Sequence, residues 1–268
     1  MRSSNFRQRT FVPLSIAAVA VVVAGAAHGR VATDGTLALQ AEVPIRYPET
    51  TCPAGTLGSL QCFARAGKAI AAGLGPLEET YAYVLENAPA GCTAPPGADS
   101  VRLPPTTAHL TVPGKGEIDV NTAGTGCLAR FGMLKASEAF TITGGSGVYA
   151  GASGGGTVTT TSFGPPSFNG NDAWTGTLVV PGLQFDLAAP TINGAVDKKV
   201  RVALRAKVVR VTYAVTAQDV VDGVVPVRCL PRSGSPFDVG RTIVTCSATD
   251  MSGNTSSARF IVSVVRRR

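Results

Sequence analysis

Histidine is nearly absent from this chain of 268 residues, in which His28 and His109 are the two copies. The sequence therefore argues against a histidine-based metal centre and against a Ser/His/Asp triad, because both need histidine side chains. The sequence also lacks CxxC spacings and a G-K-[ST] motif, which argues against a cysteine zinc site and a P-loop. We expect no catalytic residues, no metal and no cofactor.

Helical patterning is missing as well, because no long stretch of Ala, Leu, Glu and Lys recurs at helical spacing, and aromatic residues make up only 6%. What is present instead is 31 glycines and 18 prolines in a chain that is 44% hydrophobic and 15% charged. This composition is globular and favours short strands with many turns. The sequence thus predicts an all-β protein.

The first segment has the pattern of an export signal. Arg2, Arg7 and Arg9 precede the apolar run 11–27, and small residues follow it. The alternative is an uncleaved anchor, but 17 residues interrupted by Pro13 fall short of the ~20 that a spanning helix needs. We expect a signal peptide over 1–29, cleavage between Ala26 and Gly29, and a secreted or cell-surface protein.

The six cysteines agree with an exported protein, since they form an even set without zinc spacing: Cys52, Cys62, Cys92, Cys127, Cys229 and Cys246. Disulfides are the expected state outside the cytoplasm. For the first four, pairing Cys52 with Cys62 and Cys92 with Cys127 is the simplest of three possible connectivities.

Charge and composition divide the chain near Ala189. Residues 30–189 contain 8 Lys/Arg and 12 Asp/Glu, whereas 190–268 contain 13 and 5. We predict an N-terminal extension over 30–60, an antiparallel β-barrel over 61–189, a β-sandwich over 190–265 and a basic tail over 266–268.

The C-terminal part alternates with the period of half-buried strands. Val244, Cys246 and Ala248 share one face of a strand, and Phe260, Val262 and Val264 share a face of the next. Upstream, Val225, Val227 and Cys229 also fall on one side, so Cys229 and Cys246 can meet between the sheets of a small sandwich. Such a bridge contributes about 3 kcal/mol by restricting the unfolded chain.

The segments VTYAVTAQDVVDG and VPVRCLPRSGSPFDVGRTIVTCSATDMSGNTSSARFIVSV resemble a hyalin repeat (HYR) domain. The resemblance implies an immunoglobulin-like β-sandwich of secreted and surface proteins, with a role in adhesion. The family often has a cysteine in the last strand, where this sequence has Ala258 and Arg259. Together with the Ala/Gly/Val/Arg-rich usage, the pairing of domains indicates a bacterial source.

The N-terminal part reads as a series of hairpins, with Tyr81, Tyr83 and Leu85 on one face of ETYAYVLE. GSGVYA satisfies the dinucleotide-binding pattern, but it leads into glycines and a Val/Thr-rich strand rather than a helix. FTITGGSGVYAGASGGGTV resembles a stretch of allene oxide cyclase and dirigent-type β-barrels. That resemblance implies a barrel able to hold a small hydrophobic ligand, in a cavity lined by Tyr81, Tyr83, Phe140 or Phe185.

Paired carboxylates occur at Glu78 and Glu79, and at Glu117 and Asp119. Glu117 and Asp119 share a strand face. Two such carboxylates could act in acid–base catalysis if they were buried, but they lie more commonly on the exposed outer face of a strand. His109 reads as a half-exposed strand residue.

In DKKVRVALRAKVVR, four cations are separated from one another by even numbers of positions: Lys199, Arg201, Arg205 and Lys207. One strand there would present them on one face, to attract an anionic partner. The alternative is a charged strand edge that prevents aggregation.

The turn TDMSGN alternates the oxygen-bearing side chains of Asp250, Ser252 and Asn254, with Asp219 and Asp222 from AQDVVDG as candidate neighbours. The set suggests calcium but lacks the ligand series of an EF-hand. An Asx-turn with Gly253 at positive φ explains the same residues, and we predict a structural corner.

Two functions follow. The first is a non-catalytic, secreted or surface binding and adhesion protein that engages anionic cell-envelope or extracellular material, with an extracellular polysaccharide or protein as partner. The alternative is a barrel that binds or cyclises a small hydrophobic ligand. Nucleic acid is not expected, because aromatics are not interleaved among the cations. Membrane contact is expected only through the signal segment or the basic patch.

Overall fold

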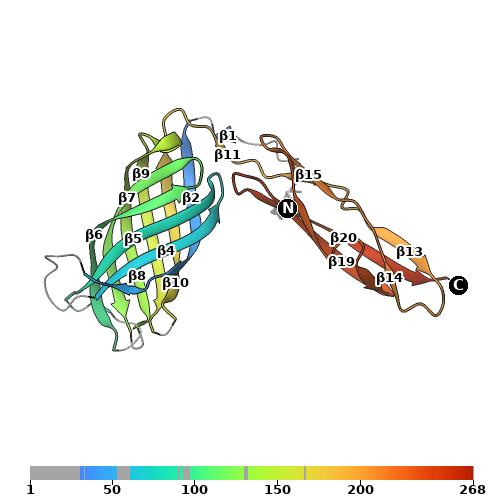
Figure 1. The fold of residues 1–268 in the computed structure, drawn as a ribbon, viewed down its shortest axis with the longest axis horizontal. Helices are drawn as coiled ribbons and strands as arrows, with labels where there is room; N and C mark the ends of the chain where they lie inside the picture. The colour runs from blue at the N-terminus through green and yellow to red at the C-terminus, as the bar shows by residue number, and fades with distance from the viewer. Residues whose placement is uncertain are drawn as a thin grey trace, which may run out of the picture.

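The computed structural model describes residues 31–32, 34–52, 61–89, 91–92, 97–129, 132–165 and 167–267. The predicted signal peptide over 1–29 lies outside the described residues. The described chain forms two β domains that lie next to each other along the long axis of the molecule, with the C-terminus at the far end of the second domain (Figure 1). The predicted all-β fold class, a barrel followed by an immunoglobulin-like sandwich, is confirmed.

The first domain is an antiparallel barrel in which strands adjacent in sequence are mostly adjacent in space. Its sheet order is β2-β10-β9-β8-β7-β6-β5-β4, and β2 also pairs with β4 so that the sheet closes. The short β3 (Glu49–Thr50) pairs with β4 outside this ring. The barrel strands are β2 (Thr36–Arg46), β4 (Gln61–Ala71), β5 (Gly75–Asn87), β6 (Asp99–Val112), β7 (Gly116–Leu128), β8 (Leu134–Gly145), β9 (Ser153–Phe163) and β10 (Asn169–Val179).

Period-two patterning explains why these segments form a barrel. In β2, Leu37, Leu39, Ala41, Val43 and Ile45 are buried and the residues between them are mostly exposed. Where the barrel closes, Ile45 pairs with Gly67 of β4. A Cβ at Gly67 would lie 2.5 Å from Val43 Cγ1 and 2.7 Å from Pro44 O, so glycine permits the close approach of β2 and β4.

The limits of the barrel differ from the sequence prediction. Residues 30–60 were expected to form an extension, yet β2 is a full barrel strand, hydrogen-bonded to β10 over Thr36–Arg46. The physical reason is that β10 and β4 would otherwise present two open strand edges, and β2 pairs with both.

GSGVYA lies in the β8–β9 connection, where Gly147–Tyr149 form one 3-10 turn, η2. Tyr149 is buried there. The segment is therefore a hairpin corner and does not lead into a helix.

The second domain contains three small sheets. They have the orders β12-β15-β16, β13-β20-β19-β17 and β14-β18. The strands are β12 (Thr191–Asn193), β13 (Lys198–Val202), β14 (Val208–Arg210), β15 (Thr216–Asp219), β16 (Gly223–Val225), β17 (Val227–Leu230), β18 (Pro236–Asp238), β19 (Gly240–Thr249) and β20 (Thr255–Arg266).

A core of its own holds this domain together. Phe237 of β18 and Val211 pack with Val244, Phe260 and Val262 of the four-stranded sheet. The alternation predicted for β19 and β20 is confirmed, because Val244, Cys246, Ala248, Phe260, Val262 and Val264 are all buried.

The two domains meet at one end of the barrel. β11 (Phe185–Asp186) pairs with β1 (Val31–Ala32) just before the sandwich begins. The β4–β5 hairpin of the barrel contacts the β19–β20 turn: a Cβ at Gly75 would lie 2.3 Å from Met251 O, and one at Gly253 would lie 2.6 Å from Ala71 O. Both glycines have positive φ, +92° and +83°, so the backbones touch where side chains could not fit.

Candidate functional site

The barrel contains a cavity of about 410 Å³ at the end remote from the sandwich. The loops that follow β2, β5, β7 and β9 border it, whereas the β4–β5 hairpin at the junction lies at the opposite strand ends. Its wall is mostly apolar and aromatic, formed chiefly by Tyr47, Phe63, Tyr83, Leu85, Leu128, Leu134 and Phe168. Volume and lining fit a pocket for a small, largely apolar molecule.

Two hydroxyl groups give this cavity a polar element. Tyr47 Oη and Ser162 Oγ are buried close to each other, and neither has another hydrogen-bond partner among the described residues. Burial raises the pKa of Tyr83 to about 12, so this wall residue is uncharged at neutral pH. A buried hydroxyl without a partner costs free energy, which a ligand group or water that bonds to it would recover.

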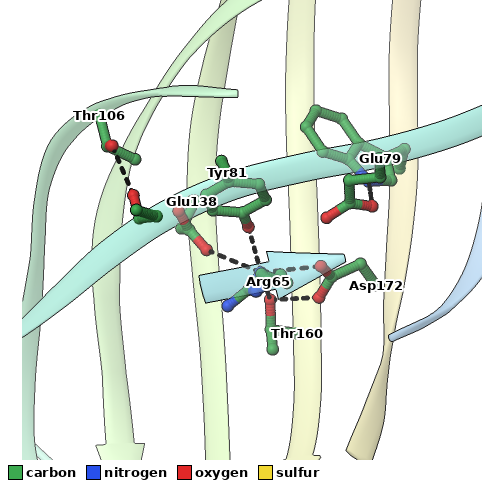
Figure 2. Close-up of polar contacts among 9 residues, drawn as sticks. Arg65, Glu79, Tyr81, Thr106, Glu138, Thr160 and Asp172 are labelled. Carbon is green, nitrogen blue, oxygen red and sulfur yellow. Dashed lines mark hydrogen bonds and ion pairs between the residues drawn. The ribbon is translucent and has the colours of Figure 1, made fainter. Parts of the chain in front are cut away.

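Deeper in the barrel, Arg65 organises a buried polar cluster (Figure 2). Its side chain is fully buried, and Nη1 lies 2.7 Å from Asp172 Oδ2 and 3.1 Å from Thr160 Oγ1. The Tyr81 hydroxyl is a third acceptor, so the two hydrogens of Nη1 are shared among three oxygens. The guanidinium carbon lies 4.5 Å from the ring centroid of Tyr81 and 4.4 Å from that of Tyr83. Tyr83 therefore borders both the cluster and the cavity.

Three acids from different strands surround this arginine. Asp172 of β10 also accepts a hydrogen bond from Thr160 Oγ1 at 2.6 Å. Glu138 of β8 has an oxygen 3.8 Å from Arg65 NH1. Glu79 of β5 accepts from Trp174 Nε1 at 2.9 Å. Burial opposes the charged guanidinium, but Tyr81 and Asp172, followed by Tyr83 and Glu138, outweigh it and raise the pKa of Arg65 above its usual value.

Burial perturbs the acids of this cluster. Burial and the nearby Asp172 carboxylate raise the pKa of Glu79 well above its usual value. Burial also raises the pKa of Glu138, which Arg65 and Thr122 partly offset. The Arg65–Asp172 pair, at 2.7 Å, is the closer of the two ion pairs that Arg65 forms in this cluster. Between the unfolded and the folded pKa, the folded state binds a proton that the unfolded chain releases, so Glu79 makes the barrel less stable as the pH rises.

The sandwich carries a different kind of surface. Lys199 and Arg201 of β13, with Arg266 and Arg267 at the end of β20, line a depression of about 850 Å³, together with Val265. We call these four cations the cationic groove. All four are exposed, and none forms an ion pair with another described residue. β13 runs parallel to β20, which places the cations of both strands at one end of the sheet (Figure 1).

The turn at Asp250 is a tight backbone turn, in which Gly253 N donates to Asp250 O at 3.3 Å. Asn254 N donates to Asp250 Oδ1 at 2.8 Å, and Asp250 N donates to Asn254 O at 3.1 Å. Gly253 has a φ of +83°. The positive φ predicted for Gly253 is confirmed, but the predicted Asx-turn is wrong, because the Asp250 side chain accepts from the N–H four residues on and not two.

Comparison with known proteins agrees with the fold of the second domain. Residues 185–264 match the family model of the HYR domain. Neither a curated protein nor a solved structure matches the chain. The resemblance of the barrel to allene oxide cyclase and dirigent-type barrels stays a prediction.

Disulfides join Cys52 to Cys62, Cys92 to Cys127 and Cys229 to Cys246. These are the pairs that the sequence favoured, and they are consistent with the extracellular setting of HYR domains. One detail was wrong. Cys229 and Cys246 are directly paired neighbours on β17 and β19 of a single sheet of the HYR domain, and their bridge does not cross between sheets. Among the described residues, no helix is long and apolar enough to cross a membrane.

The four cations proposed from sequence do not share one strand. β13 ends at Val202, so Lys199 and Arg201 lie on it, while Arg205 and Lys207 lie in the following connection. The predicted basic tail differs too: Arg266 is the last residue of β20, and Arg267 N donates to Val202 O at 2.8 Å. The HYR match also begins at 185, before the predicted boundary.

Of the side chains expected to line a cavity, only Tyr83 does so. Tyr81 faces Arg65, Phe140 packs against Trp174 with ring centroids 5.1 Å apart, and Phe185 belongs to the barrel core. Glu117 and Asp119 lie half-exposed on the outer face, where His109 Nδ1 lies 3.1 Å and 3.0 Å from their oxygens.

Sequence reasoning missed the polar cluster, although its signal was present. Arg65 has the same parity as Phe63, Glu79 as Tyr81, and Asp172 as Trp174. Charges on the apolar face of several strands indicate a buried network, because they must be paired to be tolerated there.

Proposed function

We propose that this chain is an exported, non-catalytic binding protein that attaches through its HYR domain to an anionic extracellular polysaccharide. The match of residues 185–264 to the HYR family and three disulfides support an extracellular adhesion role. The cationic groove is the reason for proposing an anionic partner, since its charged side chains are exposed and have no acidic partner among the described residues. Clustered like charges attract and retain a polymer of opposite charge.

The geometry favours an extended polymer over a small ion. The four side chains come from two parallel strands and the residue after β20, so they form an open strip along an edge. The HYR domain is strongly basic overall, with 13 Lys/Arg against 5 Asp/Glu over 190–268. Long-range attraction therefore acts together with the local groove.

Binding to dextran sulfate, with neutral dextran as the control polymer, tests this function. We expect the protein to bind dextran sulfate with an affinity that falls as salt rises. Lys199→Gln with Arg201→Gln should weaken binding roughly threefold to thirtyfold, the effect of losing two exposed charge contacts. The matched control is Arg228→Gln with Arg232→Gln, which removes the same charge from exposed residues on and just after β17.

The two double variants separate a groove from general charge. If both lose affinity equally, net charge accounts for binding and the groove assignment fails. If wild-type protein binds dextran and dextran sulfate alike, or neither, the proposed partner class is wrong.

A second candidate function rests on the barrel cavity. Its volume, its aromatic wall and its two buried hydroxyls favour a small apolar molecule with one hydrogen-bonding group. Most of the barrel interior is filled by packed side chains, which limits any ligand to the mouth.

The neutral dye N-phenylnaphthylamine tests this cavity without interference from the cationic groove. We expect its fluorescence to rise on binding, and Leu128→Trp, at the cavity wall, to abolish the rise by filling the space. Phe163→Trp, on the exposed outer face of the barrel, is the control. Equal dye binding by both variants would place the dye elsewhere.

A further inference from the structure

Four carboxylates converge where the barrel meets the HYR domain. Asp186 comes from β11, Asp219 and Asp222 from the β15–β16 turn, and Asp250 from the β19–β20 turn. One oxygen from each lies within 4.8 Å of the others. Sequence reasoning considered three of these residues and predicted no metal; the structure adds Asp186, which lies 33 positions before Asp219.

The charge of this group is unusual for its surroundings. Residues 190–268 contain only five acidic side chains among 13 basic ones, and three of the five gather here. None of the four carboxylates has a Lys, Arg or His partner among the ion pairs of the described chain. Like charges at this distance repel strongly when they are buried.

Two unpartnered oxygens point to a ligand. Asp219 is 4% exposed and Asp186 is 8% exposed. In each, Oδ1 accepts backbone N–H groups: from Ala188 at 2.9 Å for Asp186, and from Val221 at 2.8 Å and Asp222 at 3.1 Å for Asp219. In each, Oδ2 is buried with no hydrogen-bond partner in the described chain. The backbone thus fixes both carboxylates and leaves one oxygen of each for another group.

The turns that carry the other two carboxylates are held in the same place. Met251 N donates to Asp222 Oδ2 at 2.7 Å. Asn254 Nδ2 bridges the group, because it donates to Asp186 O at 3.0 Å and to Asp250 Oδ2 at 2.9 Å. Three separate segments are therefore joined around the carboxylates before any ligand is added.

We propose that Asp186, Asp219, Asp222 and Asp250 bind one calcium ion at the junction of the two domains. Each pair of oxygens lies within about twice the 2.3–2.6 Å length of a Ca–O bond, which is the separation that shared coordination of one ion requires. Calcium accepts several carboxylates directly and tolerates irregular geometry. Magnesium keeps most of its water and usually takes one or two carboxylates.

A bound ion would strengthen the contact between the two domains. The Asp250 turn touches the β4–β5 hairpin of the barrel through Met251 and Gly253. Asp186 belongs to the only described connection between the last barrel strand and the HYR domain. Binding at these segments stabilises the junction and fixes the orientation of the HYR domain against the barrel.

Calcium titration of the chelator-treated protein is the test. Isothermal titration calorimetry with CaCl2 should show one site with a dissociation constant of about 0.1–1 mM, the range of extracellular modules, and CaCl2 should raise the melting temperature. Asp219→Asn keeps the acceptor for Val221 N and removes the charge, so it should weaken calcium binding roughly tenfold or more. Asp186→Asn is a second variant with the same expectation.

Asp238→Asn is the matched control, because it removes an exposed carboxylate of the HYR domain outside the group and should bind calcium like the wild type. Without calcium, Asp219→Asn should melt above the wild type, since it relieves repulsion. MgCl2 should have a much smaller effect than CaCl2.

The proposal is overturned if the wild type gives neither heat nor a melting shift up to about 10 mM CaCl2, well above the expected dissociation constant. Wild-type affinity in both Asp219→Asn and Asp186→Asn, or equal shifts with MgCl2 and CaCl2, would also overturn it.

Discussion

Breaking the Arg65–Asp172 ion pair should destabilise the barrel far more than breaking an ion pair on its surface. We choose Asp172→Asn because asparagine keeps the shape of the side chain and removes only the charge. The variant leaves Arg65 fully buried, with Glu138 Oε1 at 3.8 Å as the nearest remaining acid and the Asp172 contact at 2.7 Å lost. Glu138 is a poor substitute because burial raises its pKa and favours the neutral form.

The magnitude follows from what Asp172 does in the cluster. Its two oxygens accept charge-assisted hydrogen bonds from Arg65 and Thr160, and removing one partner of a buried ion pair costs about 3–5 kcal/mol. Glu86→Gln is the matched control. It breaks the pair with Arg102 on the outer face, where the side chains are 28% and 62% exposed, and exposed pairs contribute about 0–1 kcal/mol.

Urea unfolding at neutral pH, followed by tryptophan fluorescence, is the assay. Trp174 is the only tryptophan in the sequence and lies in the barrel core, so its signal reports this domain and not the HYR domain. Adding Arg65→Met to Asp172→Asn should recover part of the loss, because no charge is then left unpaired. If Asp172→Asn lowers the free energy of unfolding no more than Glu86→Gln does, the ion pair is not buried away from water and the reasoning is refuted.

Two further sets of substitutions, at Glu79 and at the Cys229–Cys246 disulfide, have defined outcomes. Glu79→Gln removes a carboxyl whose pKa is raised by burial. As the pH rises from about 5 to 8, the free energy of unfolding of the wild type should therefore fall faster than that of the variant, by up to about 1.4 kcal/mol per pH unit. Equal slopes of this free energy against pH, measured by urea unfolding, would contradict the raised pKa. Replacing both Cys229 and Cys246 by serine should lower the stability of the HYR domain by about 3 kcal/mol, seen by far-UV circular dichroism, while the Trp174 transition stays in place. A shift of the Trp174 transition would show instead that the two domains unfold together.

Strand patterning was a good guide to the fold because it is a local property. Tyr81, Tyr83 and Leu85 face inward as their alternation predicts. The first barrel strand was missed although Leu37 to Ile45 alternate just as clearly. What makes this segment a barrel strand is pairing with β10 and β4, and β10 lies more than 120 residues away in the sequence.

Both polar groups are harder to predict, because their members meet only through tertiary structure. Arg65 and Asp172 are 107 positions apart, and Asp186 and Asp250 come from the two sides of the β15–β16 turn in sequence. Sequence parity indicates that Arg65 points inward, but only the closed barrel shows which acids face it. Likewise TDMSGN supplies only one of the four carboxylates, and the others come from the β15–β16 turn and from the connection to the barrel.

The positions of the three sites make the proposed functions compatible. The cavity opens at the end of the barrel remote from the HYR domain, and the cationic groove lies at the C-terminal end of the HYR domain, away from the barrel (Figure 1). A polymer held by the groove therefore does not cover the cavity. The carboxylates lie between them at the junction. Because one backbone connection would by itself leave two domains free to reorient, we expect calcium bound at this point to hold the cavity at a fixed distance and direction from the material that the groove binds.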